Sequence, residues 1–328
     1  QAIWTHGHFD RYREVSAQVM AILAEETPRV ERVSIDEAFI DITPGRFAPE
    51  DPLLVARRIS DRVAALGVTC SIGVGCNKTV AKIASERDKP FGLTIVRPGT
   101  EQRFLAALPV SAMSGIGRSA EERLRRMRIY TLGELSRAPE STLASIFGVN
   151  GERMRQRALG LEISEVTSLD EERKIKSVSN ERTFAKDLTE RGDIEAAIAL
   201  LGESVGRRLR RQGLTGGTVT LKLKYSYGSG RTAQRRLPHP TDDENIFVAV
   251  ALELLDNIWQ EGMHVRLAGI GMSDFDHQGG IQTDLFCEVD DRGAQSSDRR
   301  DLSVAIDAVR DKFGDTALSF GRQSRFND

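Results

Sequence analysis

The sequence predicts a mixed α/β protein, of the α+β kind, that is built from several domains. Three observations favour this fold class. The 328 residues suffice for two or three domains, and a hydrophobic content of 40% suffices for ordinary cores. Short apolar runs typical of strands alternate with helical periodicity over residues 1–100, and the alternation returns after residue 177. No apolar run approaches the roughly 18 residues of a membrane span.

Residues 1–100 are expected to form an α/β layer, because strands alternate with helices there. The expected elements are a helix over 10–26, strands over 30–35 and 38–42, a helix near 52–66, a strand over 68–75 and a helix from Asn77 to about Arg87. The start of the sequence lacks the layout of a signal peptide, which favours a soluble, cytoplasmic protein.

The rest of the chain divides into four further parts. Residues 101–161 show only short helices interrupted by glycines, and 162–176 are polar and aperiodic, as in a linker. Residues 177–275 follow the order strand, helix, two strands, helix, strand, with the helices near 193–212 and 243–260. Residues 276–328 form a polar tail with one amphipathic piece over 302–314.

Charge is unevenly distributed along the chain. The net charge is only −2, but Gly206 to Arg236 carries nine basic residues and no acidic one. Asp274 to Asp301 carries eight acidic residues against three arginines. A basic module of this kind indicates binding to nucleic acid, with an ordinary solvated surface as the alternative. The three cysteines form no CxxC pair, which argues against a zinc site or a disulfide framework.

The segment "RVERVSIDEAFIDIT" (29–43) places two adjacent carboxylates, Asp36 and Glu37, between two predicted strands. At a two-residue hairpin tip both would lie at one end of a sheet and open to solvent. Such a pair suits a hard divalent cation, and Mg²⁺ prefers a few carboxylates together with phosphate oxygens and water. An acidic turn without a metal is the alternative.

The segment "GVGCNKTVAKIASERDKPFG" (73–92) combines a helix start with three lysines. Asn77 can cap the helix, whose first N–H groups and positive dipole end then favour an anion. Lys78 and Lys82 share a face at i, i+4 spacing, and Lys89 follows the helix. This arrangement fits a nucleoside triphosphate, although the GxxxxGK[ST] of a P-loop is absent. Lysines on an ordinary amphipathic helix are the alternative.

Two further motifs suggest macromolecular contacts. "SGIG" (114–117) joins two predicted helices, and Gly115, Gly117 and the following Arg118 could hold a DNA phosphate in a helix-hairpin-helix contact. A plain helical turn is the alternative. "QTDLF" (282–286) resembles a peptide anchor for a partner's groove, through Gln282, Leu285 and Phe286. A chance pentapeptide is the alternative.

Five segments together resemble one known family. "SIDEAF", "NKTVAKIASERDKPFG", "LPVSAMSGIG", "VSNERTF" and "VRLAGIGMSDF" occur in the order found in Y-family DNA polymerases, most closely those of the DinB type. The resemblance runs from about Phe9 to Phe286. It implies error-prone translesion DNA synthesis by deoxynucleotidyl transfer to a primer 3′-end.

The resemblance also implies domains and roles. Residues 1–100 would be a partial palm, 101–161 the thumb and 177–275 the little finger. Asp36 would ligate catalytic Mg²⁺, with two ions in the complete enzyme, and Glu37 would complete the carboxylates. Lys89, supported by Lys82 and Lys78, would contact the incoming deoxynucleoside triphosphate. The primer-template would be held by the basic sheet of the little finger, which carries Lys222, Lys224, Arg231, Arg235 and Arg236. "QTDLF" would tether a monomeric enzyme to the sliding clamp.

One departure from the family pattern stands out. The family's first palm strand, with its "DxDxF"-like motif, and the fingers have no counterpart in these 328 residues. The chain as given is therefore expected to extend primers poorly or not at all. A non-catalytic, clamp-tethered DNA-binding adaptor is the rival hypothesis, although a dead site has no need of Asp36 and Glu37. A nucleotide cyclase shares the paired acids but has no reason to carry a basic second domain.

Overall fold

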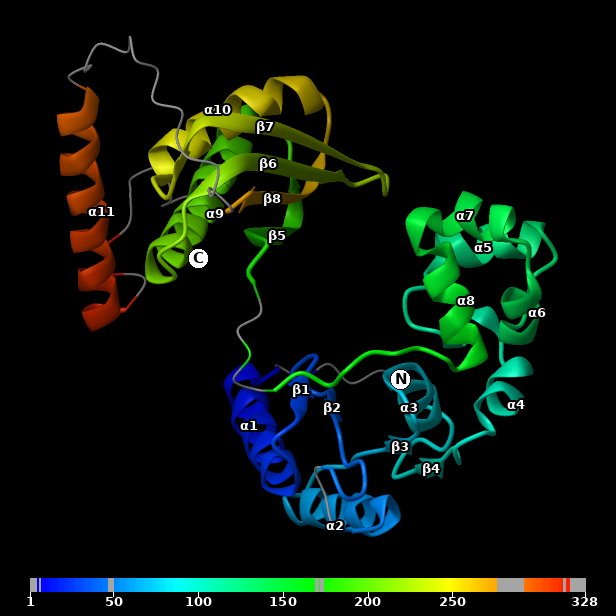
Figure 1. Ribbon diagram of the computed structural model, residues 1–328. Coiled ribbons are helices and arrows are strands. Elements are labelled where there is room, and N and C mark those ends of the chain that lie inside the picture. The colour runs from blue at the N-terminus through cyan, green and yellow to red at the C-terminus, as the bar shows by residue number, and fades with distance from the viewer. Residues whose placement is uncertain are drawn as a thin grey trace, which may run out of the picture. The chain divides into compact units, whose positions relative to one another are not determined.

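The computed structural model describes residues 5, 7–46, 50–168, 171, 174–275, 292–314 and 317–318, without the side chains of 292–301. Two compact units divide the chain, residues 1–172 and 173–328 (Figure 1). Their boundary falls inside the range 162–176 that the sequence predicts to be a linker. No helix of the described residues is long and apolar enough to cross a membrane.

The first unit opens with two helices and a short hairpin. Helix α1 (Phe9–Glu26) precedes strands β1 (Val30–Arg32) and β2 (Ala38–Ile40), which pair antiparallel. Helix α2 (Pro52–Ala65) begins after Asp51, whose carboxylate accepts a hydrogen bond from the Leu53 amide. A small apolar core joins α1 to α2 and consists of Ile22, Val55, Ile59 and Val63.

Strands β3 (Ile72–Val74) and β4 (Leu93–Ile95) pair in parallel, and helix α3 (Lys78–Ser85) connects them. The predicted strand over 68–75 is thus confined to its last part. A Cβ atom at Gly73 would lie 2.0 Å from the carbonyl oxygen of Ala81. The glycine therefore lets β3 lie directly against α3.

Short helices form the rest of the first unit: α4 (Glu101–Ala106), α5 (Arg118–Arg126), α6 (Leu132–Arg137), α7 (Glu140–Phe147) and α8 (Gly151–Leu159). Two 3₁₀ turns, Val110–Ala112 and Gly148–Asn150, lie among them. Their core also contains Val80 and Ile83 of α3. The apolar face of α3 is thus buried in the same core as helices α4 to α8, rather than in the core of α1 and α2.

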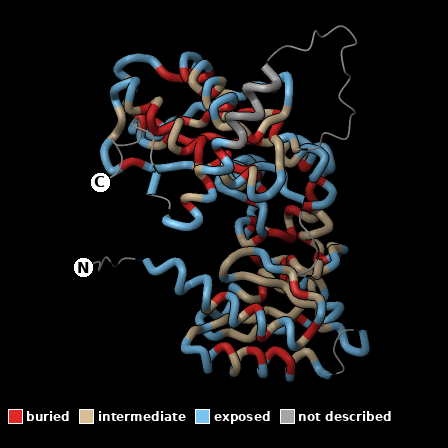
Figure 2. Tube along the Cα trace, turned by 90° about the vertical axis from the view of Figure 1, so that its left-hand side faces the viewer, coloured by how far each residue is buried: buried red, intermediate tan, exposed pale blue. Residues whose placement is uncertain are grey.

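The second unit has the strand and helix order that periodicity predicts. Its elements are β5 (Ser177–Leu188), α9 (Arg191–Arg211), β6 (Gly216–Tyr225), β7 (Gly230–Thr241), α10 (Glu244–Ile258) and β8 (Val265–Ser273). The strands form one antiparallel sheet in the order β5-β8-β6-β7. Alternate apolar residues of the strands pack with α9 and α10 in one core. Figure 2 shows the resulting alternation of buried and exposed segments.

Helix α11 (Arg292–Phe313) begins ten residues before the predicted 302. Its contacts with α9 are ionic: Asp307 bonds to Arg210 at 2.7 Å and Asp311 to Arg207 at 2.6 Å. Asp307 and Arg210 have side chains only 12% and 8% exposed. The second unit therefore holds α11 through largely buried charges.

Candidate functional site

The acidic pair lies on the connection between β1 and β2. Because Arg32 pairs with Ala38, this connection runs from Val33 to Glu37 and has five residues, which corrects the predicted two-residue tip. A local turn explains the extra length, since the Ser34 hydroxyl donates to Asp36 at 2.6 Å and accepts from the Asp36 amide at 3.3 Å. Asp36 is exposed and the Glu37 side chain is 43% exposed. Neither carboxylate is buried in a core.

A row of alternating charges connects this acidic pair to the end of α3. The Lys82 ammonium donates to Glu37 at 2.5 Å and to Glu86 at 2.9 Å. Lys89 donates to the same Glu86 carboxylate at 2.9 Å. Glu37, Lys82, Glu86 and Lys89 therefore form a continuous series, called here the charge row. The structure thus brings together three predicted residues from separate parts of the sequence, and it adds Glu86.

The charge row shifts the pKa values of its central members. Partial burial of Lys82 acts to lower its pKa, but the hydrogen bonds to Glu37 and Glu86 outweigh burial and raise the pKa. Hydrogen bonds from Lys89 and then Lys82 lower the pKa of Glu86. Lys82 thus keeps a positive charge next to Glu37 of the acidic connection, and Glu86 keeps a negative charge between Lys82 and Lys89.

Lys78 lies outside the charge row. Its ammonium bonds to Glu31 of β1, and it lies 5.9 Å from the centre of the Phe39 ring on β2. The side chains of Lys78 and Glu31 are 18% and 13% exposed. Lys78 and Lys82 share a face of α3, as their spacing predicts, and both bond to the β1–β2 hairpin: Lys78 to Glu31 on strand β1 and Lys82 to Glu37 on the connection. Lys78 therefore has a different partner from Lys82 and Lys89, and its expected support of a triphosphate stays a prediction.

The acidic pair fits a metal that arrives with a nucleotide better than a free ion. Among the residues that the structure describes, no group of three or more His, Cys, Asp or Glu side chains could hold a metal. Asp36 and Glu37 supply two carboxylates, and Glu37 shares its charge with Lys82. Mg²⁺ commonly takes one or two carboxylates and fills its remaining positions with phosphate oxygens and water. The two residues satisfy that smaller requirement.

The glycine loop Ser114–Gly117 is exposed at both of its glycines. Gly115 has a φ of +95°, which side-chain-bearing residues rarely adopt, and Gly117 is the N-cap of α5. The Arg118 side chain is 93% exposed and lies 3.1 Å from Glu122. The first helix of the predicted helix-hairpin-helix is only the 3₁₀ turn Val110–Ala112, because Pro109 and the bend at Met113 leave it one turn. The loop backbone remains accessible to a phosphate.

Register divides the five basic residues of the second sheet between its two faces. Lys222 pairs with Thr232, and Arg236 with Thr218, so these side chains share the open face with Lys224. Arg231 and Arg235 pair with the buried Leu223 and Val219 and so lie on the helix-covered face. Arg235 bonds to Glu253 of α10. The expectation that all five follow one DNA backbone is therefore wrong for Arg231 and Arg235.

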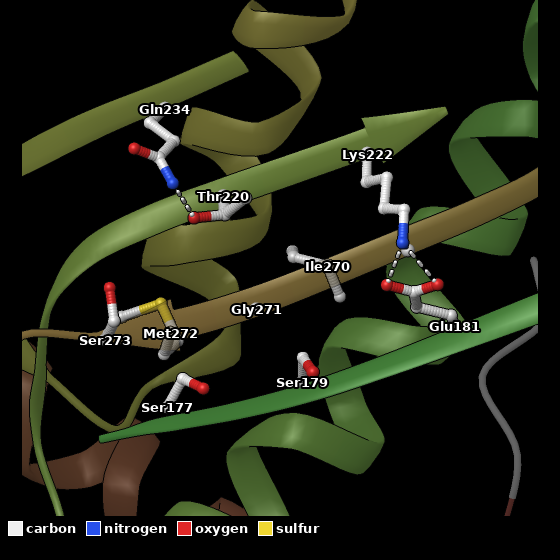
Figure 3. Close-up of a pocket in the computed structure, with 11 residues that line it drawn as sticks. Ser177, Ser179, Glu181, Thr220, Lys222, Gln234, Ile270, Gly271, Met272 and Ser273 are labelled. Atoms are coloured by element: carbon white, nitrogen blue, oxygen red, sulfur yellow. Dashed lines mark hydrogen bonds and ion pairs between the residues drawn. The ribbon is translucent and has the colours of Figure 1, made fainter. Parts of the chain in front are cut away.

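A groove of about 340 Å³ lies on the open face of this sheet, with a mixed polar and apolar lining (Figure 3). Figure 3 shows Lys222 beside Glu181 at one end, where they bond at 2.8 Å, and Ser177 and Ser273 at the other. The remaining lining residues include Ser179, Thr220, Gln234, Gly269 and Gly271. Gly269 and Gly271 leave strand β8 without side chains at these two positions on the open face. Sequence reasoning missed these residues, although the alternation in "SVSNE" and "AGIGMS" places them on one face.

The predicted partner-binding residues Gln282, Leu285 and Phe286 lie outside the residues that the structure describes. Their role therefore stays a prediction from the sequence.

Two family models match the chain. Residues 1–86 match the impB/mucB/samB family, and residues 175–285 match the impB/mucB/samB family C-terminal domain. The chain is 35% identical to DNA polymerase IV of Lactococcus lactis subsp. cremoris, over 84% of this chain and 75% of that protein. It is 33% identical to DNA polymerase IV of Dehalococcoides mccartyi, over 100% of this chain and 82% of that protein.

Solved structures agree on the fold. A Y-family DNA polymerase chimera superimposes with a TM-score of 0.71 at 22% identity, over 84% of this chain and 79% of the other. The family models and the relatives together identify a protein of the DNA polymerase class, a DNA-directed nucleotidyltransferase, and the solved structure agrees with them in fold. The chain belongs to the DinB type of the Y-family DNA polymerases.

Proposed function

We propose that this protein carries out template-directed, error-prone translesion DNA synthesis with Mg²⁺ and deoxynucleoside triphosphates. The charge row is the observation that carries the proposal. It sets Lys82 beside the exposed acidic connection and links Lys89 to Lys82 through the shared carboxylate of Glu86. An anion with its own divalent cation, such as a magnesium-bound triphosphate, has the complementary charges.

Each end of the charge row has its own task in this proposal. Asp36 and Glu37 would hold magnesium, and the two ions of the complete enzyme would supply the charge that activates the primer 3′-hydroxyl and stabilises the leaving pyrophosphate. Lys89 is 52% exposed, and its ion pair with Glu86 is a surface pair. Such pairs contribute little free energy, so triphosphate oxygens can replace Glu86 as the partner of Lys89.

The same proposal assigns the primer-template to two surfaces. The glycine loop offers exposed backbone at Gly115 and Gly117 together with the Arg118 side chain. The groove on the second sheet offers hydroxyl and amide groups beside Lys222, Lys224 and Arg236. These groups contact phosphates without reading bases, which suits an enzyme that accepts any sequence. Binding should weaken steeply as salt rises, because phosphate counterions are released.

We further propose that Gln282, Leu285 and Phe286 bind a sliding clamp through an extended peptide. Deletion of 282–286 should abolish capture by the clamp and leave DNA affinity unchanged. Capture of the clamp by the deletion variant would refute this assignment.

Nucleotide binding distinguishes the polymerase from the non-catalytic adaptor. The test titrates each deoxynucleoside triphosphate, with and without Mg²⁺, into the chain bound to a primer-template. A polymerase should bind the nucleotide that pairs with the template base, and only when Mg²⁺ is present. An adaptor should bind the DNA alone. DNA binding without any magnesium-dependent nucleotide binding would overturn the proposed function.

Primer extension is a separate question for this polypeptide. In the part of the chain that the structure describes, the acidic connection offers two adjacent carboxylates to a metal, and one of them bonds to a lysine. We therefore expect the chain by itself to bind DNA and nucleotide but to extend a primer slowly. Rapid magnesium-dependent extension would contradict that expectation.

A further inference from the structure

Arg157, near the end of α8, contacts two parts of the site at once. One terminal nitrogen of its guanidinium, Nη1, donates to the Ser114 carbonyl oxygen at 2.8 Å. The Nε atom donates to the Thr79 hydroxyl at 2.8 Å. Ser114 opens the glycine loop, and Thr79 lies in the first turn of α3. One side chain therefore bridges the proposed DNA-phosphate loop and the proposed triphosphate helix.

The segment that contains Arg157 also holds the start of α3 at other points. Thr79 is a buried residue with an exposed fraction of 3%, and its hydroxyl donates to the Glu162 carboxylate at 2.5 Å. The Asn77 side chain accepts from the Val80 amide at 3.0 Å and donates to the Gly160 carbonyl at 2.7 Å. The cap of α3 is thus bonded directly to the end of α8.

At the other end of the bridge, the glycine loop is anchored in the helical core by Ile116, which is 7% exposed, whereas Ser114 and Gly115 lie outside that core. Its backbone is anchored by the Ile116 amide, which donates to the Met113 carbonyl at 3.1 Å. Ser114 and Gly115 are exposed, and a Cβ at Gly115 would lie 3.5 Å from Arg157 Nη1. The hydrogen bond from Arg157 therefore fixes the Ser114 carbonyl in a loop that is otherwise open on that side.

Stability alone does not explain a buried arginine here. The Arg157 side chain is 17% exposed, and burial lowers its pKa even though Glu162 opposes the shift. The apolar core that contains Leu124, Leu143 and Met154 already packs these helices together. A buried charge pays a desolvation cost and is a weak source of stability, but it can specify one arrangement of the elements that it joins.

We propose that Arg157 is a positioning residue that fixes the glycine loop relative to α3, so that bound DNA strengthens nucleotide binding. The inference rests on the proposed function, because it assigns DNA to the loop and the triphosphate to α3. Its physical basis is the planar guanidinium, which donates in two directions that a lysine ammonium on one flexible stem does not reproduce.

The first experiment uses the free chain and needs no ligand. Hydrogen exchange is measured at the Ile116 and Val80 amides of the wild type, Arg157→Met and Arg157→Lys. Arg153→Met is the matched control, because Arg153 lies one turn earlier on α8, its side chain is 68% exposed, and it lies 3.8 Å from Glu162. Both amides should exchange at least about ten-fold faster in Arg157→Met, and at wild-type rates in Arg153→Met. Unchanged rates at both amides in Arg157→Met would overturn the bridge.

The second experiment measures the factor by which a bound primer-template tightens magnesium-nucleotide binding. Couplings between sites are commonly five-fold or more, and we expect about that factor in the wild type and in Arg153→Met. Arg157→Met and Arg157→Lys should lower it towards one while each ligand alone still binds. Full coupling in either Arg157 variant would overturn the inference. Failure of the wild type to bind nucleotide at all would instead contradict the proposed function, and the coupling with it.

Discussion

The Lys82 ammonium lies 2.5 Å from the Glu37 carboxylate, across a sequence separation of 45 residues. This contact joins the acidic connection after β1 to the helix that follows β3. It keeps a cation next to one proposed metal ligand, in a position to bind phosphate oxygens that the metal brings.

Replacement of Lys82 by methionine should weaken binding of a magnesium-bound nucleotide by about ten-fold, the usual loss for one hydrogen bond to a charged group. Lys82→Arg keeps the charge and should retain most of the affinity. The measurement is a competition titration against a fluorescent nucleotide on the DNA-bound chain. Equal affinity of the wild type and Lys82→Met would exclude Lys82 from the site.

Glu86 makes the stability of the charge row depend on pH. Hydrogen bonds from Lys89 and Lys82 hold its pKa below the ordinary value of 4.5. When the pKa of a carboxylate is lower in the folded chain than in the unfolded chain, its ionised form stabilises the fold at a pH above the unfolded-state pKa. This stabilisation is lost as the pH falls through the folded-state pKa. Wild type should therefore be more stable than Glu86→Gln near neutral pH, and the difference should shrink below about pH 4.5. Urea denaturation of both proteins between about pH 3 and pH 7 measures this difference in the free energy of unfolding. A difference that does not change with pH would contradict the prediction.

Arg235 and Arg236 are neighbours in sequence but lie on opposite faces of the second sheet. Arg236→Ala should weaken DNA binding for all sequences alike and lower the slope of log affinity against log salt by about one. Arg235→Ala removes the same charge but faces α10, and should change the slope little. Fluorescence anisotropy at several salt concentrations measures both. A larger loss of DNA affinity in Arg235→Ala than in Arg236→Ala would contradict the assignment of DNA to the open face of the sheet.

Asp307 and Asp311 offer a matched pair for the docking of α11. Asp307→Ala removes one of the carboxylates that bond to the buried Arg210. Because breaking a buried ion pair costs about 3 kcal/mol, this variant should have a free energy of unfolding lower by about that amount. The Asp311 side chain is 51% exposed, so Asp311→Ala should change stability little. Thermal denaturation of the two variants compares them. An effect of Asp307→Ala no larger than that of Asp311→Ala would show that α11 is not held by the buried pair.

The parts of the fold that sequence predicts best are those that local periodicity defines. The helix after Asn77 begins at its predicted cap, and the strand and helix order of the second unit follows from alternating apolar residues. The length of the β1–β2 connection was not predictable in the same way, because it depends on a side-chain turn at Ser34.

Long-range partners are what the sequence hides. The spacing of Lys82, Glu86 and Lys89 already favours pairing within the helix, but nothing local reveals that Lys82 also reaches Glu37. Arg157 gives no signal at all, since its partners lie 43 and 78 residues away. The face on which Arg235 lies could have been predicted from the sequence, because residues two apart on a strand point to the same side of the sheet and Leu237 is buried.

Lys89 gives the most direct test of the nucleotide site. Affinity for a magnesium-bound, template-matched nucleotide is measured on the DNA-bound wild type, on Lys89→Ala and on Arg87→Ala, which removes an exposed positive charge two residues away. A site formed by the acidic pair and the α3 lysines predicts a loss of about ten-fold or more in Lys89→Ala and little change in Arg87→Ala. Equal losses in both variants, or binding that persists without Mg²⁺, would contradict it.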